Sequence, residues 1–495
     1  MTKELTVLFV TPEAVPFAKT GGLADVAGTL PLALQRQGLK LQVIMPLYGM
    51  IKQGEHSLSL VAENLKANLG PNLLEFNLFK ATSGGVPFYF VERDEFYERS
   101  QLYGTSRGDY FDNLERYTFL ARSLLPICLA LDLKPDIVHC HDWQSALVPV
   151  YMKTDWSWLA PMADSASVFT IHNLAYQGLF DRAKFPLLGL DWSLFSIDGL
   201  EYYDSINLLK GGIMFADTIT TVSRQYSREI QTPEFGYGLE GVLQSRAAVL
   251  TGIVNGVDYS NWDPATDPLL VANYHPQSLA GKAKNKQALM EKYGLASKLA
   301  AAPLLGMISR LADQKGFDLV ASVLPKLLAQ DVTLVILGTG EEKYHQLLTQ
   351  EAQKYPGKLG VKIAYDNTLA HLIEAGADLF LMPSRYEPCG LNQIYSMKYG
   401  TIPVVRATGG LVDTVEPVDL AKGTGTGFQF EEYSPEAFLA ALQAAISAYQ
   451  NKSLWSKLMQ NAMAQDFSWE TSARAYLELY HQTLKRKTTE IRRAL

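Results

Sequence analysis

Three segments of the chain place cationic or glycine-rich residues between an apolar run typical of a strand and an apolar repeat typical of a helix. They are residues 19–26 (KTGGLADV), 308–316 (ISRLADQKG) and 384–393 (SRYEPCGLNQ). A helix N-terminus presents backbone N–H groups and the positive end of its dipole, and glycine lets a ligand approach that backbone closely. Loops at the carboxyl ends of parallel strands line the ligand crevice of an open α/β sheet. The three segments therefore predict a site for a phosphorylated ligand.

Length and composition restrict the class of protein. The chain has 495 residues, which is too long for one hydrophobic core and favours two domains. With 47% hydrophobic and 19% charged residues and a formal net charge of −7, it is typical neither of disordered chains nor of nucleic-acid-binding proteins. Its cysteines, Cys128, Cys140 and Cys389, have no disulfide or zinc spacing, and no apolar run is long enough to span a bilayer. We therefore expect a cytoplasmic protein that binds neither nucleic acid nor membranes.

Two series of alternating strands and helices divide the chain near residue 250. The first begins with a strand over 5–10 and a helix over 23–37, and it includes a turn-rich region that reaches to about residue 73. The second begins with a strand over 304–308. Further apolar runs predict a hairpin at 77–80 and 88–92 and strands at 41–45, 136–140, 168–171, 218–222, 332–337, 361–365, 378–382 and 402–405. The predicted fold class is α/β, with two doubly wound domains over 1–250 and 251–475.

Further motifs accompany these segments, and together they indicate a family. They are His141-Asp142-Trp143, residues 172–178 (HNLAYQG) and residues 255–258 (NGVD). With residues 19–26 and 387–391, they occur in one order and with ordinary spacing. Over nearly its whole length the chain resembles the bacterial glycogen synthase and plant starch synthase family.

The resemblance implies a fold and an activity. The fold is of the GT-B type, in which two Rossmann-like domains face each other across a deep cleft and a last helix, residues 476–495, packs back on the N-terminal domain. The activity is a retaining transfer of glucose from ADP-glucose to the non-reducing end of an α-1,4-glucan or maltooligosaccharide. Because the nucleotide-sugar is a substrate, we expect no cofactor, and we expect no metal.

The resemblance and the residue chemistry together assign roles to positions of this chain. The expected catalytic residues are His172, Arg310, Lys315 and Glu387. The expected donor-binding residues are Lys19, Gly21, Gly22, Asp25, Asn173, Asn255, Tyr365, Cys389, Gly390, Leu391 and Asn392. The expected acceptor-binding residues are His141, Asp142 and Trp143.

The implied reaction builds negative charge on the leaving phosphate and positive charge on the sugar ring. The chain has no Asp-x-Asp triplet to hold a divalent metal, so we expect Arg310 and Lys315 to neutralise the phosphate, helped by backbone N–H groups of the glycine-rich loops. Glu387 precedes a proline and is biased to an extended conformation. There it can accept hydrogen bonds from glucose hydroxyls and hold Lys315 by its charge. The alternatives are a solvated pair for the two cations and a helix-dipole cap for Glu387.

His172 is expected to face the reacting side of the sugar, where its ring shields the developing cation. A retaining double displacement needs a carboxylate nucleophile about 5 Å from its partner acid. Because the motif has a histidine there, we predict same-face attack, in which the departing phosphate takes the proton of the acceptor hydroxyl. The indole of Trp143 offers an apolar face to an acceptor sugar.

Several of these residues have simpler explanations. A lone histidine is more often structural, Asn255 belongs to an Asn-Gly pair typical of a turn, and Tyr365 suits ordinary core packing. Residues 139–142 (HCHD) suggest a metal site, but adjacent residues of a strand point to opposite faces and cannot all bind one ion. Asn392 and Gln144 stand where relatives often carry Thr and His, which leaves the donor and acceptor preference open.

Other functions fit parts of the pattern. A catalytically silent glucan-binding homologue would keep the fold, although the charged residues are intact here. Another GT-B transferase would use UDP-glucose or a sucrose-type acceptor. A glycogen-type phosphorylase needs a pyridoxal-phosphate lysine and usually a longer chain, and an NAD-dependent oxidoreductase needs a Gly-x-Gly-x-x-Gly after the first strand, which is absent. The sequence does not determine the oligomeric state.

Overall fold

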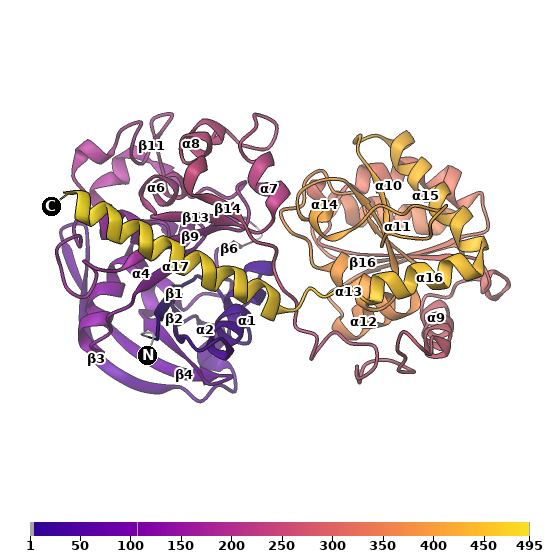
Figure 1. Ribbon diagram of the computed structural model, residues 1–495, viewed down its shortest axis with the longest axis horizontal. Helices are drawn as coiled ribbons and strands as arrows, with labels where there is room; N and C mark the ends of the chain where they lie inside the picture. Colours follow the sequence, from indigo (N-terminus) through magenta and orange to yellow (C-terminus); the bar gives the residue numbers. More distant parts are fainter. Residues whose placement is uncertain (1–3, 106, 495) are drawn as a thin grey trace. The chain divides into compact units, whose positions relative to one another are not determined.

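The computed structural model describes residues 4–105 and 107–494, which divide into two compact units (Figure 1). The first unit comprises the chain up to Val222, Ser227–Gly256 and the chain from Trp469 onward. The second comprises Ser223–Tyr226 and Val257–Ser468. The helix expected over 476–495 thus begins earlier, as α17 (Trp469–Ala494), and it belongs to the first unit.

A nine-stranded sheet forms the centre of the first unit. In spatial order its strands are β14 (Leu250–Gly252), β13 (Thr218–Thr221), β9 (Ala166–Ile171), β8 (Ile137–His141), β1 (Thr6–Val10), β2 (Lys40–Pro46), β5 (Val86–Glu92), β4 (Asn72–Ser83) and β3 (Ser59–Leu69). Neighbours from β14 to β5 pair in parallel, whereas β5, β4 and β3 pair antiparallel. Every residue of β8, β9 and β13 is buried, as expected of a parallel sheet covered on both faces.

The antiparallel edge of this sheet corrects one expectation. The region up to residue 73 was expected to be turn-rich, and that is wrong because it contains all of β3. β3 is mostly exposed, and its pairing with β4 shifts register twice, around Ala62. Bulges and an exposed edge remove the apolar alternation by which a strand is recognised in a sequence.

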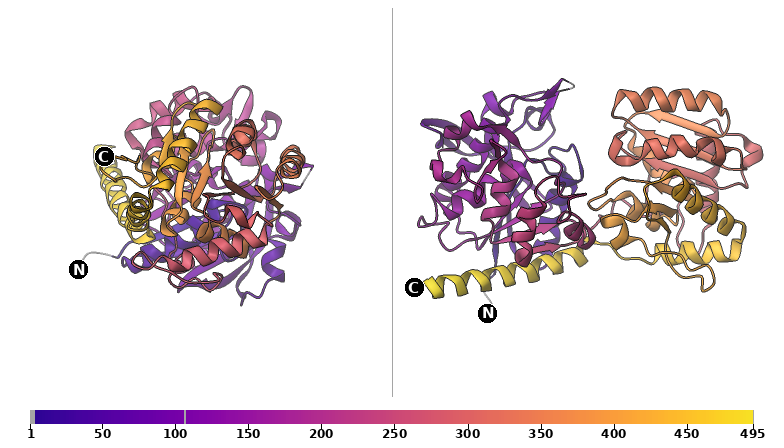
Figure 2. Two further views of the ribbon diagram at one scale, coloured as in Figure 1. Left: turned by 90° about the vertical axis from the view of Figure 1, so that its right-hand side faces the viewer. Right: turned by 90° about the horizontal axis from the view of Figure 1, so that it is seen from above.

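Helices cover the first sheet. The longer ones are α1 (Gly22–Arg36), α4 (Asn113–Ala130), α5 (Leu147–Lys153), α6 (Leu208–Phe215) and α17. Figure 2 shows α17 running along one side of the unit, where it packs against α1 and β9. The Tyr480 hydroxyl of α17 lies 2.8 Å from His139 Nδ1 of β8, and the Thr483 hydroxyl lies 2.7 Å from that of Thr218. The last helix therefore completes the core of the unit in which the chain began.

A six-stranded parallel sheet forms the centre of the second unit. In spatial order its strands are β17 (Leu359–Ile363), β16 (Thr333–Gly338), β15 (Leu304–Ile308), β18 (Leu379–Met382), β19 (Ile402–Arg406) and β20 (Phe428–Phe430). Alternate strand residues enter two hydrophobic clusters, with Leu305 and Leu381 in one and Leu304 and Phe380 in the other. Each cluster includes residues of different helices, so the sheet is covered on both faces. The predicted α/β class with two doubly wound sheets is confirmed.

The helices of the second unit alternate with its strands. They are α9 (Ala280–Lys292), α10 (Phe317–Leu328), α11 (Glu342–Lys354), α12 (Asn367–Gly376), α13 (Asn392–Lys398), α14 (Gly410–Thr414), α15 (Pro435–Gln450) and α16 (Lys452–Met463). No helix in the described part of the chain is long and apolar enough to cross a membrane.

Smaller elements decorate the first unit. A three-stranded sheet has the order β10 (Leu179–Asp181), β12 (Ser205–Asn207), β11 (Glu201–Tyr202), and the segment between β10 and β11 forms the 3-10 helices η2 (Arg182–Leu188) and η3 (Trp192–Leu194). The remaining short elements are α2 (Gly49–Gln53), α3 (Asp94–Tyr97), β6 (Gly104–Thr105), β7 (Gly108–Asp109), α7 (Arg224–Glu229) and α8 (Glu240–Ser245).

The strand order changes direction once in each sheet. In the first sheet β1 lies between β2 and β8, and in the second β15 lies between β16 and β18. Loops that follow two such neighbouring strands run to opposite faces of the sheet and leave a crevice at the carboxyl ends of the strands. The loops after β1, β8, β15 and β18 carry the motifs that the sequence analysis selected, so each unit has its motifs at its own switch point.

Candidate functional site

In the first unit, the loop after β1 is organised by a buried carboxylate. Glu13 accepts hydrogen bonds from the backbone N–H (2.6 Å) and the hydroxyl (2.7 Å) of Thr20, next to the glycine pair. Burial raises the pKa of Glu13 to about 7. Glu13 carries no motif signal, and the sequence analysis missed it. It fixes the conformation of the loop that leads into α1.

The glycine-rich turn leaves the start of α1 open. Gly21 precedes the helix with an extended backbone, and no side chain caps it. A Cβ atom added at Gly22 would meet nothing within 4 Å, so packing within the protein does not explain this glycine. Lys19 Nζ lies 2.7 Å from Asp25 Oδ1 in a partly exposed ion pair. The arrangement suits an anion at the helix start, with a cation close by.

Three histidines form a buried chain behind this loop. Within the chain, His139 Nε2 lies 2.6 Å from the Thr170 hydroxyl, and His141 Nδ1 lies 3.0 Å from His172 Nε2. The rings of His139 and His141 stack with their centroids 4.3 Å apart. Burial lowers the pKa values of His139 and His172 to about 3, so both rings are neutral near pH 7. No group of three metal-binding side chains occurs among residues 4–105 and 107–494.

Asp142 connects β8 to the His172 loop. Its backbone lies in the left-handed region, with φ +54°, and its Oδ1 accepts the backbone N–H of His172 at 2.7 Å. Burial raises the pKa of Asp142 to about 8, although hydrogen bonds from the backbone of His172 and Asn173 oppose that rise. The carboxyl therefore holds residues 172–173 in place, and its role towards an acceptor stays a prediction.

Trp143 is a packing residue in this structure. It is buried, its ring lies edge-on to Tyr117 with centroids 5.0 Å apart, and Phe180 approaches within 5.8 Å. A Cβ atom added at Gly178, whose φ is +65°, would lie 2.6 Å from the indole. Only glycine therefore fits at the end of the 172–178 motif, against Trp143.

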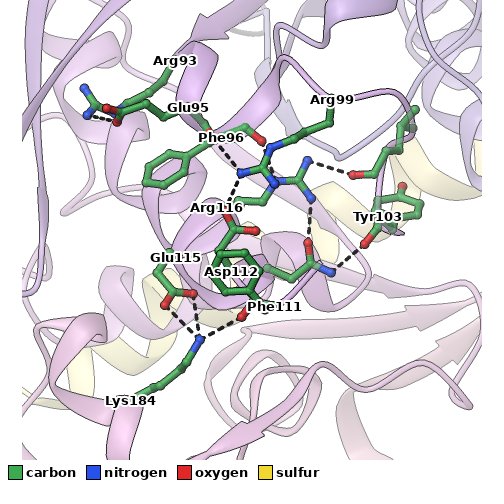
Figure 3. Close-up of polar contacts among 12 residues, drawn as sticks. Arg93, Glu95, Phe96, Arg99, Tyr103, Phe111, Asp112, Glu115, Arg116 and Lys184 are labelled. Atoms are coloured by element: carbon green, nitrogen blue, oxygen red, sulfur yellow. Dashed lines mark hydrogen bonds and ion pairs between the residues drawn. The ribbon is translucent and has the colours of Figure 1, made fainter. Parts of the chain in front are cut away.

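A buried arginine organises the loop between α3 and α4 (Figure 3). Arg116 is fully buried, and its guanidinium donates to the backbone oxygens of Phe96 (2.7 Å) and Leu102 (2.8 Å) and to Asn113 Oδ1 (2.6 Å). Tyr103, which follows Leu102 in this loop, has a buried hydroxyl with no hydrogen-bond partner in the described part of the chain. Burial and the charges of Glu13 and Asp142 raise its pKa. Tyr103 is thus a candidate site residue that the sequence analysis missed, and Arg116 holds its loop.

Asn255 is buried just after β14. Its Oδ1 atom has no partner in the described part of the chain, so the residue has an unused acceptor. A Cβ atom added at Gly256 would lie 2.6 Å from Trp469 Cα, so α17 begins too close for any other residue there. Close packing against α17 therefore explains Gly256. The role of Asn255 in binding the sugar donor stays a prediction.

In the second unit, the expected ion pair is present. Lys315 Nζ lies 2.6 Å from Glu387 Oε2, and the Ser384 hydroxyl donates to the same oxygen at 3.0 Å. Glu387 is buried and Lys315 is about one-fifth exposed, so the pair is shielded from water. A Cβ atom added at Gly316 would lie 2.0 Å from the Pro383 carbonyl oxygen, which shows how closely the loops after β15 and β18 pack. Arg310, in the first of these loops, is exposed.

The loop before α13 follows a left-handed turn. Gly390 has φ +71°, and Cys389 is buried beside it. The backbone N–H of Gly410 donates to the carbonyl oxygen of Glu387 at 3.0 Å, which ties this loop to α14. Asn392 Nδ2 donates to the Ile308 carbonyl oxygen at 2.6 Å, so Asn392 joins the start of α13 to the end of β15. The amide at this position therefore forms a bond between the two loops of the switch point.

Tyr365 lies outside any strand, because β17 ends at Ile363. The residue is 83% exposed. The core-packing alternative for Tyr365 is therefore wrong, and its role in stacking on a base stays a prediction. The predicted cleft between the two domains also stays a prediction.

Comparisons with known proteins match both units. A family model described as starch synthase catalytic domain matches residues 6–245, and one described as glycosyl transferases group 1 matches residues 291–462. The chain is 47% identical to a glycogen synthase of Koribacter versatilis, over 96% of this chain and 98% of the relative. It is 46% identical to a glycogen synthase of Geotalea uraniireducens, over 98% and 100%.

Solved structures give the same result. The catalytic domain of starch synthase IV from Arabidopsis thaliana, bound to ADP and acarbose, matches with a TM-score of 0.89 and 35% identity, over 98% of this chain and 100% of that chain. A sucrose-phosphate synthase of Thermosynechococcus elongatus matches with a TM-score of 0.61, over 98% of this chain and 100% of that chain. At 15% identity this match is informative about the fold alone.

Proposed function

Because the chain belongs to the glycogen synthase and starch synthase family of glycosyltransferases, we propose that it transfers glucose from ADP-glucose to the non-reducing end of an α-1,4-glucan. The starch synthase IV relative was solved with ADP and acarbose, which supports ADP as the nucleotide. We further propose that the configuration at the anomeric carbon is retained, and that the reaction needs no metal.

The ion pair of Lys315 and Glu387 carries the proposal for the donor. The pair lies at the switch point of the second unit, with 2.6 Å between its charged atoms, and Arg310 lies in the same loop after β15 as Lys315. When the bond between sugar and diphosphate breaks, the Lys315 ammonium can move from Glu387 to the phosphate. The positive charge that the phosphate needs is then already present in this loop. Arg310 adds the fork that suits two phosphate oxygens. Glu387 then accepts hydrogen bonds from glucose hydroxyls.

The neutral histidines of the first unit support same-face attack. A cation develops on the sugar ring, and an uncharged His172 does not repel it as an imidazolium would. Asp142 is the nearby carboxyl, and its raised pKa of about 8 and its bonds to residues 172–173 make it a poor nucleophile at neutral pH. The acceptor hydroxyl then attacks from the side on which the phosphate departs, and the phosphate oxygen takes the hydroxyl proton.

One assay tests the donor, the acceptor and the stereochemistry together. The purified protein is given ADP-glucose or UDP-glucose with maltotriose, and in a separate arm with fructose. We expect release of ADP, lengthening of maltotriose by α-linked glucose seen by NMR, and much slower reaction with UDP-glucose. Transfer to fructose would indicate a sucrose-type enzyme, and no release of either diphosphate would indicate a silent homologue.

The metal-free proposal has its own test. The enzyme is treated with EDTA, desalted and assayed with ADP-glucose and maltotriose, with and without added Mg²⁺. We expect the same rate in both arms, because side-chain cations stabilise the leaving group. An inactive stripped enzyme that Mg²⁺ restores would contradict the proposal.

A further inference from the structure

His141 is a fully buried member of the histidine chain in the first unit. Its side chain has no exposed surface, whereas His172 is 9% exposed. The rings of Phe9 and His139 both pack on the His141 ring, with centroids 5.2 Å and 4.3 Å from its centroid. The backbone oxygen of His141 accepts the Ser145 hydroxyl at 2.8 Å, at the end of β8. Packing therefore holds the His141 ring in place, and the ring can affect a substrate only through a neighbouring side chain.

One proton lies between His141 and His172. His141 Nδ1 is 3.0 Å from His172 Nε2, a hydrogen-bond distance. Burial lowers the pKa values of both rings, so each ring is neutral near pH 7 and carries a single N–H group. Two N–H groups or two lone pairs that faced each other would repel, so one ring donates and the other accepts. The surroundings of the two remaining ring nitrogens determine which ring donates.

These two nitrogens differ in their access to water. His141 Nε2 is buried and has no hydrogen-bond partner in the described part of the chain. No residue described in the structure bonds to His172 Nδ1 either, but this atom is not buried, so water or a substrate can reach it. If His172 donated, the His141 proton would lie on Nε2 as an orphaned buried N–H group, which is rare in folded proteins. If His141 donates, its Nε2 keeps only a lone pair, and both protons of the pair have a partner.

We propose that His141 is a positioning residue, which donates its Nδ1–H to His172 Nε2 and so fixes the proton of His172 on Nδ1. His172 then presents an N–H donor on its accessible side. Such a donor can bind a sugar hydroxyl, but it cannot take the proton of the acceptor hydroxyl. The departing phosphate is then left as the base. The proposal rests on the proposed function for the identity of the substrate, whereas the position of the proton does not depend on it.

Two contacts then hold His172. Asp142 Oδ1 accepts the backbone N–H of His172 at 2.7 Å and fixes the main chain, while His141 fixes the ring. Both ring nitrogens of His139 lie within 2.8 Å of hydroxyl groups, which can donate or accept. His139 therefore packs on His141 without imposing a direction on the bond between His141 and His172.

A nuclear magnetic resonance spectrum of the histidine side chains tests the position of the proton. The full chain is labelled with ¹⁵N in its histidines, and the spectra of His141→Asn and His172→Asn identify the two sets of signals. A ring nitrogen with a proton and one without resonate in well separated regions. Near pH 7 we expect a proton on Nδ1 and none on Nε2 in both His141 and His172. A proton on His172 Nε2 would overturn the proposal.

Steady-state kinetics with ADP-glucose and maltotriose test the effect on transfer. His141→Leu removes the donor but keeps an apolar side chain, and we expect kcat to fall about tenfold with little change in KM, because the ring of His172 is no longer held in one tautomer. His141→Asn places an amide N–H near the position of Nδ1 and is expected to restore most of the parent kcat. Cys140→Ala, at the adjacent buried position of β8 and on its other face, is the matched control for lost packing.

The variants distinguish a donated proton from a packing role. A His141→Leu enzyme as fast as the Cys140→Ala control would overturn the proposal. A folded His141→Asn enzyme as slow as His141→Leu would also overturn it, because the shape of the imidazole and not its proton would then matter. If His141→Leu does not fold, the spectra and the His141→Asn kinetics still decide. If the parent transfers no glucose to maltotriose, the proposed function fails, while the spectra still test the position of the proton.

Discussion

His172 in the first unit and Lys315 in the second both follow a parallel strand, yet their surroundings differ in charge. His172, Asp142 and Glu13 are buried, and burial shifts their pKa values towards the neutral forms, to about 3, 8 and 7. Lys315 instead lies against the carboxylate of Glu387, in the same loop as the exposed Arg310. An uncharged, hydrogen-bonding environment suits sugar hydroxyls and a developing cation, whereas a charged one suits a diphosphate. In the proposed mechanism, the neutral first unit serves the sugar and the charged second unit serves the diphosphate.

The largest effect is expected when the Lys315 cation of the second unit is removed. Lys315→Ala is expected to lower kcat with ADP-glucose by about 10²–10³-fold, because a preorganised donor to the leaving group is lost. Lys354→Ala removes an exposed lysine of α11 that pairs with Glu351 and is the control. Steady-state kinetics at saturating maltotriose, with a thermal melt to check folding, measure the effect. A Lys315→Ala enzyme as fast as the control would break the comparison.

The corresponding substitution in the first unit is His172→Ala. We expect kcat to fall about 100-fold, since the ring contacts the reacting face of the sugar in the proposed mechanism. The control is His275→Ala, because His275 is exposed. A KM effect with unchanged kcat would assign His172 to ground-state binding and would contradict its role in the transfer.

The raised pKa values of the first unit predict how stability depends on pH. Asp142 and Glu13 are protonated in the folded state up to about pH 8 and 7, but they ionise near pH 4 when the chain unfolds. The folded state therefore binds more protons in this window, and stability falls as the pH rises through it. Below pH 6.5 the buried neutral histidines make stability rise with pH, because they take up protons when the chain unfolds.

Between pH 6.5 and 8 the carboxyl effect dominates. Glu374 of the second unit, whose pKa burial raises to about 8, adds to it, and Lys282, whose pKa burial lowers to about 7, opposes it. We expect the free energy of unfolding to decrease by about 2 kcal/mol over this range, measured by denaturant titration. Asp142→Asn keeps the acceptor oxygen and removes the titration, so its slope should be clearly smaller. Equal slopes in the variant and the parent would show that Asp142 is ionised in the folded state.

The smallest expected effect concerns the bond between the loops of the second unit. Asn392→Thr replaces the Nδ2 donor with a hydroxyl that sits one bond farther from the Ile308 carbonyl oxygen. We expect a loss of about 1 kcal/mol in stability and a two- to threefold higher KM for ADP-glucose, because one hydrogen bond that positions the loop is lost. Kinetics with both nucleotide-sugars measure whether the donor preference moves as well. A lower KM in the variant would show that Asn392 is not a positioning residue.

The contact between Lys315 and Glu387 was predictable, but the buried charges of the first unit were not. Lys315 and Glu387 belong to motifs at the ends of strands, and the apolar run over 304–308 matches β15. Arg116 lies in a helix whose apolar repeat gives no sign that the guanidinium is buried. Its burial depends on carbonyl groups of Phe96 and Leu102, in an irregular loop with no periodicity. Side-chain environments that a folded loop creates leave no pattern in the sequence.

Tyr365 and β3 show two other reasons for missed predictions. Tyr365 looks like the end of a buried strand because it follows an apolar run, but that strand ends two residues earlier. β3 is an exposed edge strand, so solvent and not a core selects its residues. For Tyr365 burial was inferred from residue type, whereas for β3 a strand was missed because its exposure removes the apolar pattern.

The return of α17 to the first unit has a consequence for how the protein is made. His139, in the buried histidine chain, has the hydroxyl of Tyr480 as a partner, and Tyr480 leaves the ribosome long after the rest of that unit. The whole of the second unit, which ends at Ser468, emerges before this partner does. The half of the molecule that is synthesised first is therefore the half that is finished last, and a nascent chain stopped near residue 468 carries a complete second unit beside an unfinished first one.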